Sequence, residues 1–209
     1  YNNSLKSKNP QQFYFHPNPF LLSLITNYKN YTFKVSDIDP NVIWIKRKSH
    51  NEEKELHSFL WLNLIDRKNK NVTVQRIIKE WIAKHSKYTK DIWDEDLTSL
   101  RIISWISNAD LILNTNDKDF NKSFYKNTIR QINFIKKNIN NFNDDNKKIS
   151  SISLLILSGL VFKEYFTYYK IGLKELKKLT DNYFDANGFP INRNFENLLT
   201  FVQYFILIK

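Results

Sequence analysis

The chain has 209 residues, of which 42% are hydrophobic and 15% aromatic, so it carries enough apolar material for a folded core. Three glycines and five prolines are too few for the turns of an all-β sandwich or barrel, and the absence of cysteine excludes disulfides and thiolate chemistry. The formal net charge is +11. Because lysine supplies most of it, whereas arginine favours phosphate recognition, we interpret the basicity as a solvated lysine-rich surface.

Residues 1–50 differ from the rest, because they hold most of the prolines. We expect an extended arm with one helical turn after Pro19 and a small hairpin made by the alternating runs 31–35 and 42–45. The opening at Tyr1 without Met, and an end inside an apolar helical pattern, predict a piece of a longer protein. No apolar stretch approaches the ~20 residues of a membrane-spanning helix, so we expect no membrane span.

Helical periodicity dominates residues 51–209. Apolar residues recur at spacings of three and four in several segments, whereas 56–65 and 149–162 are apolar nearly all round and must be covered on every side. The alternation predicts an inner set of helices wrapped by an outer set. The predicted helices lie near 52–67, 73–87, 95–113, 120–140, 147–166, 172–183 and 193–209.

Short polar links between these helices favour antiparallel neighbours, so the expected unit is the helical hairpin. We therefore assign the chain to the all-α class. It is predicted to be an incomplete, curved or closed array of antiparallel helical hairpins over residues 51–209, preceded by a short irregular arm over residues 1–50.

The residue types by themselves indicate no catalytic or metal site. The histidines form no metal-binding pair, and His85 closes an apolar stripe, where a structural role is expected. The acidic residues Asp91, Asp94, Glu95 and Asp96 precede a helix, where carboxylates interact favourably with the helix dipole, so we interpret them as capping residues. We expect no metal and no cofactor in this segment.

Four motifs, in the same order along the chain, carry a family resemblance. They are 59–64 with Trp81 and Ile82, then Trp93 and Asp96 with 101–106, then 146–149 with 157–162, and finally 188–194. Together they resemble the helical domain of the heparinase II/III-like family, an alginate-lyase-like domain of lyases that cleave uronate-containing polysaccharides. The resemblance implies an α/α toroid, here incomplete. It also implies a C-terminal β-sandwich beyond Lys209, which is where a metal of the family would be bound.

The resemblance assigns roles to six residues. It makes Asn146 the group that neutralises the uronate carboxylate during β-elimination. It implies that the anionic polysaccharide or oligosaccharide is bound by Arg193, Asn194, Arg101, Trp105 and Lys147. Lys147 stands where the family has His, and 195–198 replace its Tyr, so this segment is expected to bind the glycan and not to catalyse alone. Tyr165, Tyr168 and Tyr169 are candidates for a replacement acid or base.

Structural interpretations of the same residues stay open. Asn146 would also serve as an ordinary helix cap, and Arg193 would also pair with Asp181, Asp185 or Glu196. The tryptophans lie on apolar stripes and are expected in the core. The alternative functions are a non-catalytic glycan-binding or scaffold domain and, disfavoured by the low arginine content, a nucleic-acid-binding domain that uses Lys136, Lys137, Lys147 and Lys148.

Overall fold

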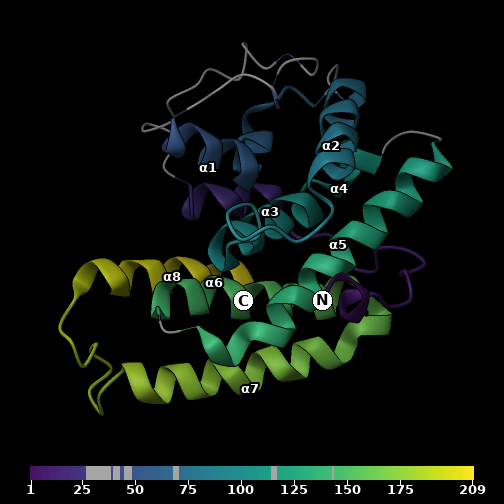
Figure 1. Ribbon diagram of the computed structural model, residues 1–209. Coiled ribbons are helices and arrows are strands. Elements are labelled where there is room, and N and C mark those ends of the chain that lie inside the picture. The colour runs from purple at the N-terminus through teal and green to yellow at the C-terminus, as the bar shows by residue number, and fades with distance from the viewer. Residues whose placement is uncertain (27–38, 40–42, 45–48, 68–70, 114–116, 143) are drawn as a thin grey trace.

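The computed structural model describes residues 1–26, 39, 43–44, 49–67, 71–113, 117–142 and 144–209. These residues are mostly helical and contain no β-strand, which confirms the all-α prediction (Figure 1). The α-helices are α1 (His50–Ser58), α2 (Asn71–His85), α3 (Glu95–Ser107), α4 (Ala109–Leu113), α5 (Lys118–Asn138), α6 (Asp145–Val161), α7 (Phe166–Tyr183) and α8 (Phe195–Ile208). The short 3-10 helices are η1 (Asn2–Leu5), η2 (Pro19–Leu24), η5 (Leu60–Leu64), η6 (Ile139–Asn141) and η7 (Lys163–Tyr165).

Side-chain caps define where five of the α-helices begin. Ser49 precedes α1 and accepts from the Glu52 N–H. Asp94, Asp117, Asp144 and Asn194 precede α3, α5, α6 and α8, and the side chain of each accepts a hydrogen bond from a backbone N–H of the first turn. Each such cap stabilises a helix by about 1 kcal/mol. The expected role of Asp94 is thereby confirmed, whereas the cap of α6 is Asp144 and not Asn146.

Two of the predicted helices are each divided. Phe59 has a φ of 58°, in the left-handed region, and ends α1 before η5, so 52–67 is not continuous. Asn108 separates α3 from α4. Its Nδ2 donates to the Ser104 carbonyl at 3.0 Å, and its Oδ1 accepts from Arg67 Nη2 at 2.5 Å. Side-chain bonds of this kind compete with helix continuation, and hydrophobic periodicity does not reveal them.

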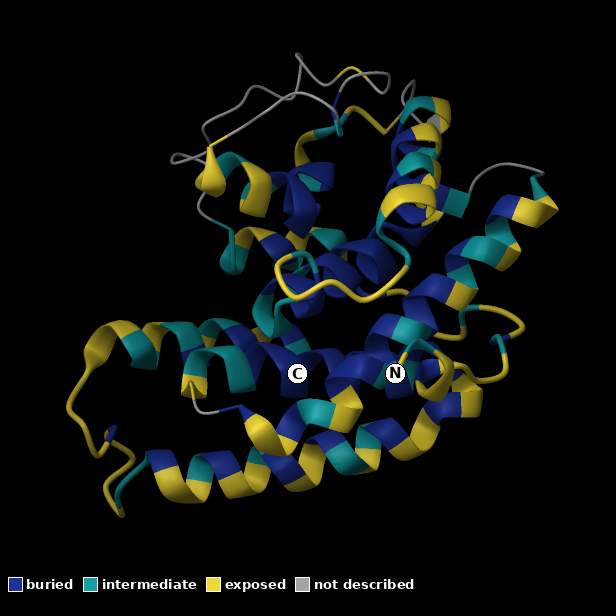
Figure 2. Cartoon of the chain, in the orientation of Figure 1, coloured by how far each residue is buried: buried dark blue, intermediate teal, exposed yellow. Residues whose placement is uncertain are grey.

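Helices α3 and α6 lie at the centre of the fold. In α6 every residue from Ile149 to Val161 except Leu160 is buried, and the helix packs against α7, α3, α8 and α5. Figure 2 shows buried positions running along α6, whereas α5 and α7 alternate between buried and exposed faces. The segment that is apolar nearly all round is thus enclosed by its neighbours, as expected.

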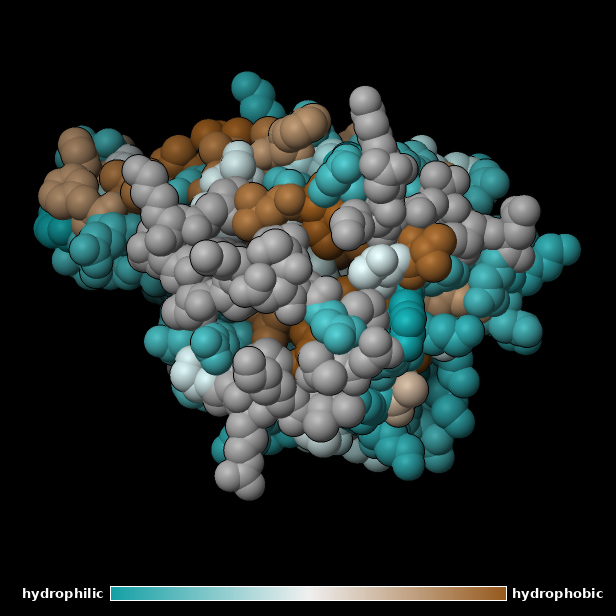
Figure 3. Space-filling view, turned by 90° about the horizontal axis from the view of Figure 1, so that it is seen from above, coloured by the Kyte–Doolittle hydropathy of each residue, from teal (hydrophilic) through white to brown (hydrophobic). Residues whose placement is uncertain are grey.

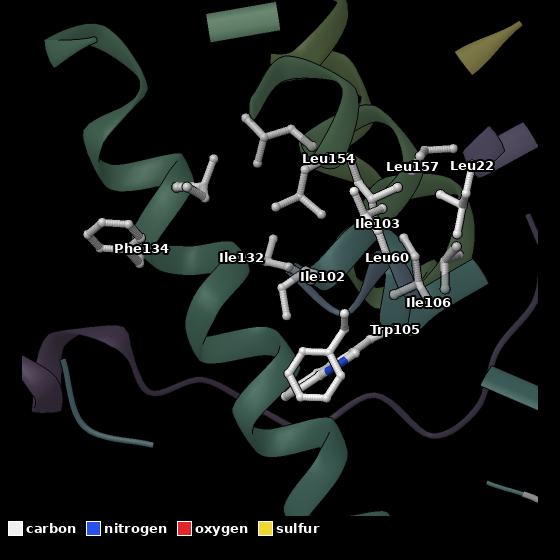
Figure 4. Close-up of a cluster of buried hydrophobic side chains, with 14 of the residues drawn as sticks. Leu22, Leu60, Ile102, Ile103, Trp105, Ile106, Ile132, Phe134, Leu154 and Leu157 are labelled. Atoms are coloured by element: carbon white, nitrogen blue, oxygen red, sulfur yellow. The ribbon is translucent and has the colours of Figure 1, made fainter. Parts of the chain in front are cut away.

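The hydrophobic core joins side chains from all parts of the chain. Figure 4 shows Leu154 and Leu157 of α6 close to Ile103 and Ile106 of α3, with Leu22 of η2 beside them. The same core holds an aromatic cluster around Phe59, whose ring lies 5.4 Å from Trp105 and 5.5 Å from Trp61 between ring centroids. The expectation that the tryptophans lie in the core is confirmed for those of the described helices, which are Trp61, Trp81 and Trp105.

The N-terminal arm contributes to this core. The predicted turn after Pro19 is η2, and it is capped by Asn18, whose side chain accepts from the Phe20 N–H. Leu5 is fully buried and its carbonyl accepts a hydrogen bond from Asn133 of α5 at 2.9 Å. Of the two runs of the predicted hairpin, only positions 43 and 44 lie within the described residues, so the hairpin falls outside the description.

Two glycines set the distance between α6 and α7. A Cβ built on Gly159 would lie 2.7 Å from the Tyr169 Cβ and 2.9 Å from its Cα, and a Cβ on Gly172 would lie 3.0 Å from the Ile156 backbone nitrogen. Real Cβ atoms do not approach backbone so closely, and only glycine permits this contact. The pair brings α7 directly onto the central helix, and α7 begins at Phe166, before the predicted start at 172.

Part of the surface is apolar. In α8 the exposed residues Phe195, Leu199, Val202 and Ile206 follow spacings of four, three and four and therefore form one face of the helix. Seen from above the view of Figure 1, hydrophobic groups gather in patches among hydrophilic ones (Figure 3). In the described part of the chain, no helix has both the length and the apolar character needed to cross a bilayer.

Candidate ligand-binding site

A cavity of about 610 Å³ lies between α1 and the start of α3. Its walls come from α1, from the segment 88–94 that leads into α3, from the first turn of α3 and from the end of η2 (Figure 1). Carboxylates outnumber lysines among the lining residues. The carboxylates are Glu53, Glu55, Asp91, Asp94, Glu95 and Asp96, and the lysines are Lys54, Lys90 and Lys147.

A second cavity of about 330 Å³ adjoins the first. It is lined by polar side chains of α6 and α8 and by the α6 cap Asp144, together with residues that also line the first cavity. The α6 and α8 side chains are Asn146, Lys147, Thr200, Gln203 and Tyr204. Ile25, Asp96, Leu100 and Lys147 line both cavities, and we call these four residues the shared wall.

The capped starts of α3 and α6 meet at this wall. Lys147 Nζ of α6 donates to Asp94 Oδ2 at 2.9 Å, so the cap of α3 is tied to the first turn of α6. Burial alone would raise the pKa of Asp94, but its bonds to Lys147 and to two backbone N–H groups hold the pKa below the ordinary value. The bond to Asp94 raises the pKa of Lys147 in turn. Both side chains are about one-third exposed, so the pair contributes modestly to stability and mainly fixes where the lysine lies.

Asp96 and Tyr204 approach each other across the buried hydroxyl of Ser150. Ser150 Oγ donates to Asp96 Oδ1 at 2.8 Å. Burial raises the pKa of Asp96, and the charges of Asp94 and Asp144 add to the effect, whereas the bond from Ser150 opposes it. Burial raises the pKa of Tyr204 well above its ordinary value, and the negative charge of Asp96 adds to this. Both shifts are in the direction that stabilises the protonated form of the group relative to its ordinary state.

Asn146 lies at the wall of the smaller cavity in the first turn of α6. Its Nδ2 donates to Asn197 Oδ1 of α8 at 2.8 Å. Its Oδ1 is buried and has no hydrogen-bond partner within the described part of the chain. The Asn146 side chain thus links α6 to α8 and does not cap its own helix, because Asp144 already accepts from the N–H groups of residues 146 and 147.

The six residues assigned from the resemblance do not gather at one place. Asn146 and Lys147 lie together at the smaller cavity. Arg193 and Asn194 belong to the connection before α8 and line neither cavity: Arg193 is exposed, has a φ of 56° and pairs with Asp185 at 2.8 Å, and Asn194 caps α8. The pairing of Arg193 with Asp185 was one of the alternatives left open by the sequence.

Arg101 and Trp105 belong to the core and not to a substrate-binding surface. Both are 0% exposed. Arg101 donates to Gln131 of α5 and to the His57 carbonyl of α1. The Trp105 ring packs against Trp81 of α2 and Phe124 of α5. The guanidinium of Arg101 lies 4.5 Å from the centre of the Trp81 ring. The expectation that these two residues contact a glycan is therefore corrected.

The tyrosines proposed as acid or base lie at the other end of α6. Tyr168 donates to Asn133 Oδ1 at 2.6 Å, and the Tyr165 hydroxyl contacts Ser7 and the Lys8 carbonyl of the arm. Burial raises the pKa of Tyr168 to about 12. Because Asn146 begins α6 and these residues follow its end, about 20 Å of helix separates them from the cavities. Tyr165 and Tyr168 are therefore packing residues for the arm.

The expected structural role of His85 is supported by its surroundings. Its ring lies against the rings of Trp81, Trp44 and His57, with the His57 centroid at 5.0 Å. Burial lowers the pKa of His85 from 6.5 to about 4, and the charges of Arg101 and Lys84 add to the shift. His85 is therefore neutral in the folded protein at neutral pH.

Acidification should destabilise the fold through His85. The unfolded chain binds a proton near pH 6.5 and the folded chain only near pH 4, so the free energy of unfolding should fall as the pH drops through this window. The raised pKa of Asp96 acts in the opposite direction. The comparison of wild type with His85→Gln isolates the histidine: the urea midpoint of the variant should fall less between about pH 7 and about pH 4.5. Equal losses in the two proteins would contradict a partly buried His85 that stays neutral in the folded chain.

Sequence reasoning missed Asp96, Ser150 and Tyr204 as site residues. Asp96 was grouped with the capping carboxylates, but one side chain occupies the capping position, and it is Asp94. The signal was present in the spacing, since a carboxylate two residues after a cap lies in the first turn of the helix and is free of the capping role. No group of three or more potential metal ligands occurs among the residues that the structure describes.

Comparison of the chain with known protein families, with curated proteins and with solved structures finds no match.

Proposed function

We propose that this chain binds a uronate-containing glycan at the two cavities and is the helical part of a polysaccharide lyase that acts by β-elimination. The observation that carries the proposal is that Asn146 and Lys147, two residues assigned to the uronate by the resemblance, line the smaller cavity together with Thr200 and Gln203. The lining of this cavity also includes the carboxylates Asp96 and Asp144, so it combines amides, hydroxyls, two carboxylates and one cation. Convergent polar groups of these kinds form hydrogen bonds with a polyhydroxylated ligand, and Lys147 is the cation for its acidic group.

The chemistry explains the demand for a neutral donor at this place. In β-elimination a base removes the C5 proton of the uronate, the C4–C5 double bond forms, and the bond from C4 to the leaving oxygen breaks as that oxygen takes up a proton. Negative charge accumulates on the C6 carboxylate, and hydrogen bonds that strengthen with this charge lower the barrier. The carboxamide of Asn146 is the donor in this proposal. Asn146 Nδ2 donates to Asn197 Oδ1, and the buried Asn146 Oδ1 has no partner among the described residues, so this role requires the Asn146 carboxamide to exchange its bond with Asn197 for a bond to the ligand.

The acidic larger cavity sets limits on what it accepts. Its excess of carboxylates repels a second uronate carboxylate, whereas carboxylate oxygens accept hydrogen bonds from sugar hydroxyls. We place the acidic group of the ligand in the smaller cavity because Asn146 and Lys147 both line it, and hydroxyl-bearing parts of the sugar in the larger one. This arrangement should bind a glycan with alternating charged and neutral edges more tightly than a uniformly charged polymer.

We also propose that the helices of residues 51–209 form an incomplete α/α toroid. Support for a curved array comes from α6, which is enclosed by α3, α5, α7 and α8. The exposed apolar face of α8 is the kind of face that a further helix covers in such an array. A β-sandwich partner domain is part of the same proposal.

A non-catalytic glycan-binding domain is the second candidate, and one observation favours it. Asn197 stands in the segment where the family has its Tyr, and its side chain is bonded to Asn146. The phenols of Tyr165 and Tyr168 are far from the cavities. Tyr204 is the phenol at the smaller cavity, and it is only 5% exposed. A lyase of this geometry needs Tyr204 or a group from a partner domain to move the proton.

Titration calorimetry of the whole chain with uronate oligosaccharides, with neutral oligosaccharides and with DNA tests the proposal. We expect binding of the uronates, weakened about tenfold by Asn146→Ala and by Lys147→Ala and unchanged by the exposed α7 variant Lys174→Ala. Equal binding of neutral sugars, or tighter binding of DNA that falls steeply with salt, would refute it.

The absorbance of unsaturated uronate products separates the two candidates. A lyase forms these products, and Asn146→Ala lowers turnover more than binding. Binding without products, in the chain and in a longer protein that contains it, supports the non-catalytic domain.

A further inference from the structure

Asp96 occupies the wall shared by the two cavities. It lies in the first turn of α3, two residues after the cap, and lines both cavities together with Lys147. A side chain at this place contacts a ligand in either cavity. It also lies where the larger cavity meets the smaller one, so its protonation state affects which ligand charge is accepted there.

The Asp96 carboxyl group has one oxygen engaged and one available. Ser150 is 0% exposed, and its hydroxyl donates to Asp96 Oδ1 at 2.8 Å while also lying 2.9 Å from the Lys147 carbonyl oxygen. Within the described residues, the side-chain hydrogen bond of Asp96 is made by Oδ1, which leaves Oδ2 for a ligand. Since Ser150 is held by the buried face of α6, it fixes the orientation of the carboxyl plane.

Burial and the carboxylates near Asp96 disfavour a negative charge on it, whereas the Ser150 hydroxyl and the charge of Lys147 favour one, and the balance raises its pKa. Asp94 and Glu95 flank it on α3, Asp144 and Lys147 face it from α6, and Tyr204 faces it from α8. The charge of Lys147 is engaged by Asp94 at 2.9 Å. The end of η2 contributes Ile25 and Thr26, which carry no charge. The titratable groups that line the larger cavity from α1 and from the segment before α3 are His50, Glu53, Lys54, Glu55, His57, Tyr88, Lys90 and Asp91.

From this geometry we propose that Asp96 recognises the carboxylate of the bound uronate as a neutral carboxylic acid, with the Oδ2 proton shared between the two groups. This inference rests on the proposed function and names the residue that makes the site specific for an acidic sugar. Two carboxyl groups that share one proton form a short, strong hydrogen bond, whereas two carboxylates at the same distance repel. The raised pKa of Asp96, caused first by burial, agrees with this state.

The proposal makes uronate binding depend on pH in a defined direction. When Asp96 loses its proton, the shared bond is replaced by repulsion, so affinity should fall as the pH rises, and it should fall for an acidic ligand only. Asn has the shape of a protonated Asp and carries a donor at all pH values, so Asp96→Asn should remove the dependence. The other carboxylates at the cavities stay in place in this variant and serve as an internal reference.

The experiment measures the affinity of the whole chain for a hexuronate trisaccharide and for its carboxyl-reduced, neutral counterpart at about pH 5 and about pH 8. The proteins are wild type, Asp96→Asn, Asp96→Ala and Asp119→Asn, the last of which removes one charge from the exposed surface of α5. We expect wild type and Asp119→Asn to lose about tenfold in uronate affinity at the higher pH, Asp96→Asn to bind equally at both, and Asp96→Ala to bind about tenfold more weakly at the lower pH. Carbon NMR of the side-chain carboxyl groups without ligand should show an Asp96 signal that titrates above the ordinary range of aspartate.

The outcomes separate this inference from the proposed function. If the uronate binds but Asp96→Asn is as weak as Asp96→Ala, or if wild-type affinity is independent of pH, the inference is overturned and the proposed function stands. If no protein binds the uronate, both are overturned. An Asp96 signal that titrates in the ordinary range overturns the inference whatever the ligand does.

Discussion

Replacing Arg101 by Met should lower the free energy of unfolding by about 3–5 kcal/mol. The Arg101 side chain is 0% exposed and donates through Nε to Gln131 Oε1 at 2.7 Å, through Nη1 to the His57 carbonyl at 3.1 Å, and through Nη2 to the Ile92 carbonyl and Thr98 Oγ1, each at 3.0 Å. Met preserves the length of the side chain but leaves these acceptors buried without donors, and each unsatisfied acceptor costs about 1–3 kcal/mol.

The measurement is urea unfolding followed by the fluorescence of the buried tryptophans. Burial lowers the pKa of Arg101 to about 9, so the residue still carries its charge at neutral pH. Arg101→Lys keeps the charge but not the fork of donors, and it should also destabilise the protein. Arg76→Met on α2 is the matched control, because the Arg76 side chain is 56% exposed and its ion pair with Glu80 is long, at 3.7 Å. This variant should change the free energy of unfolding by less than about 0.5 kcal/mol. If Arg101→Met also changed the free energy of unfolding by less than about 0.5 kcal/mol, the acceptors would have found other donors.

Replacing Gly159 by Ala should destabilise the protein by about 1–3 kcal/mol, although the same change in an open helix stabilises it by about 1 kcal/mol. The added methyl group would meet the Tyr169 backbone and Cβ of α7, with the Cβ at 2.7 Å, and neither helix can yield without displacing the core. The sign of the effect therefore reports the close contact between α6 and α7.

Two further variants calibrate this result in chemical denaturation. Gly172→Ala should destabilise less, because its nearest obstacle is the Ile156 Cγ1 atom, which a rotation of the side chain can move, and the backbone lies at 3.0 Å. Thr167→Ala, exposed on the first turn of α7, should stabilise slightly through helix propensity. A stabilised Gly159→Ala protein would mean that α6 and α7 are farther apart than described.

The helices were predictable because their signals are local. The stripes of α2 and α8 and the all-apolar run of α6 follow from spacings within one segment. The breaks at Phe59 and Asn108 were not predictable. The left-handed backbone of Phe59 and the bond from Arg67 to Asn108 depend on neighbours outside the helix. Local periodicity records which face is apolar and does not record what interrupts it.

The site was predictable only in part. Asn146 and Lys147 were singled out by the family resemblance, and they line the same cavity because they are neighbours in the first turn of one helix. Arg101 and Trp105 were assigned to the ligand by the family resemblance, but both are buried, and residue type alone does not distinguish a buried arginine held by neutral acceptors from an exposed one. Asp96 was passed over because its role depends on Ser150, which is 54 residues away in the chain.

By itself, the sequence determined that this protein is helical, where most of its helices lie and that α6 is enclosed. These properties could be predicted because the spacing of apolar residues along one helix indicates which of its faces are buried. Tertiary structure decided that Asp96 lies at the wall shared by the two cavities, that Arg101 is buried and how closely α6 approaches α7. These properties depend on the mutual docking of helix ends that are distant in the chain, where burial and neighbouring charges, rather than residue type, set the chemistry of each side chain.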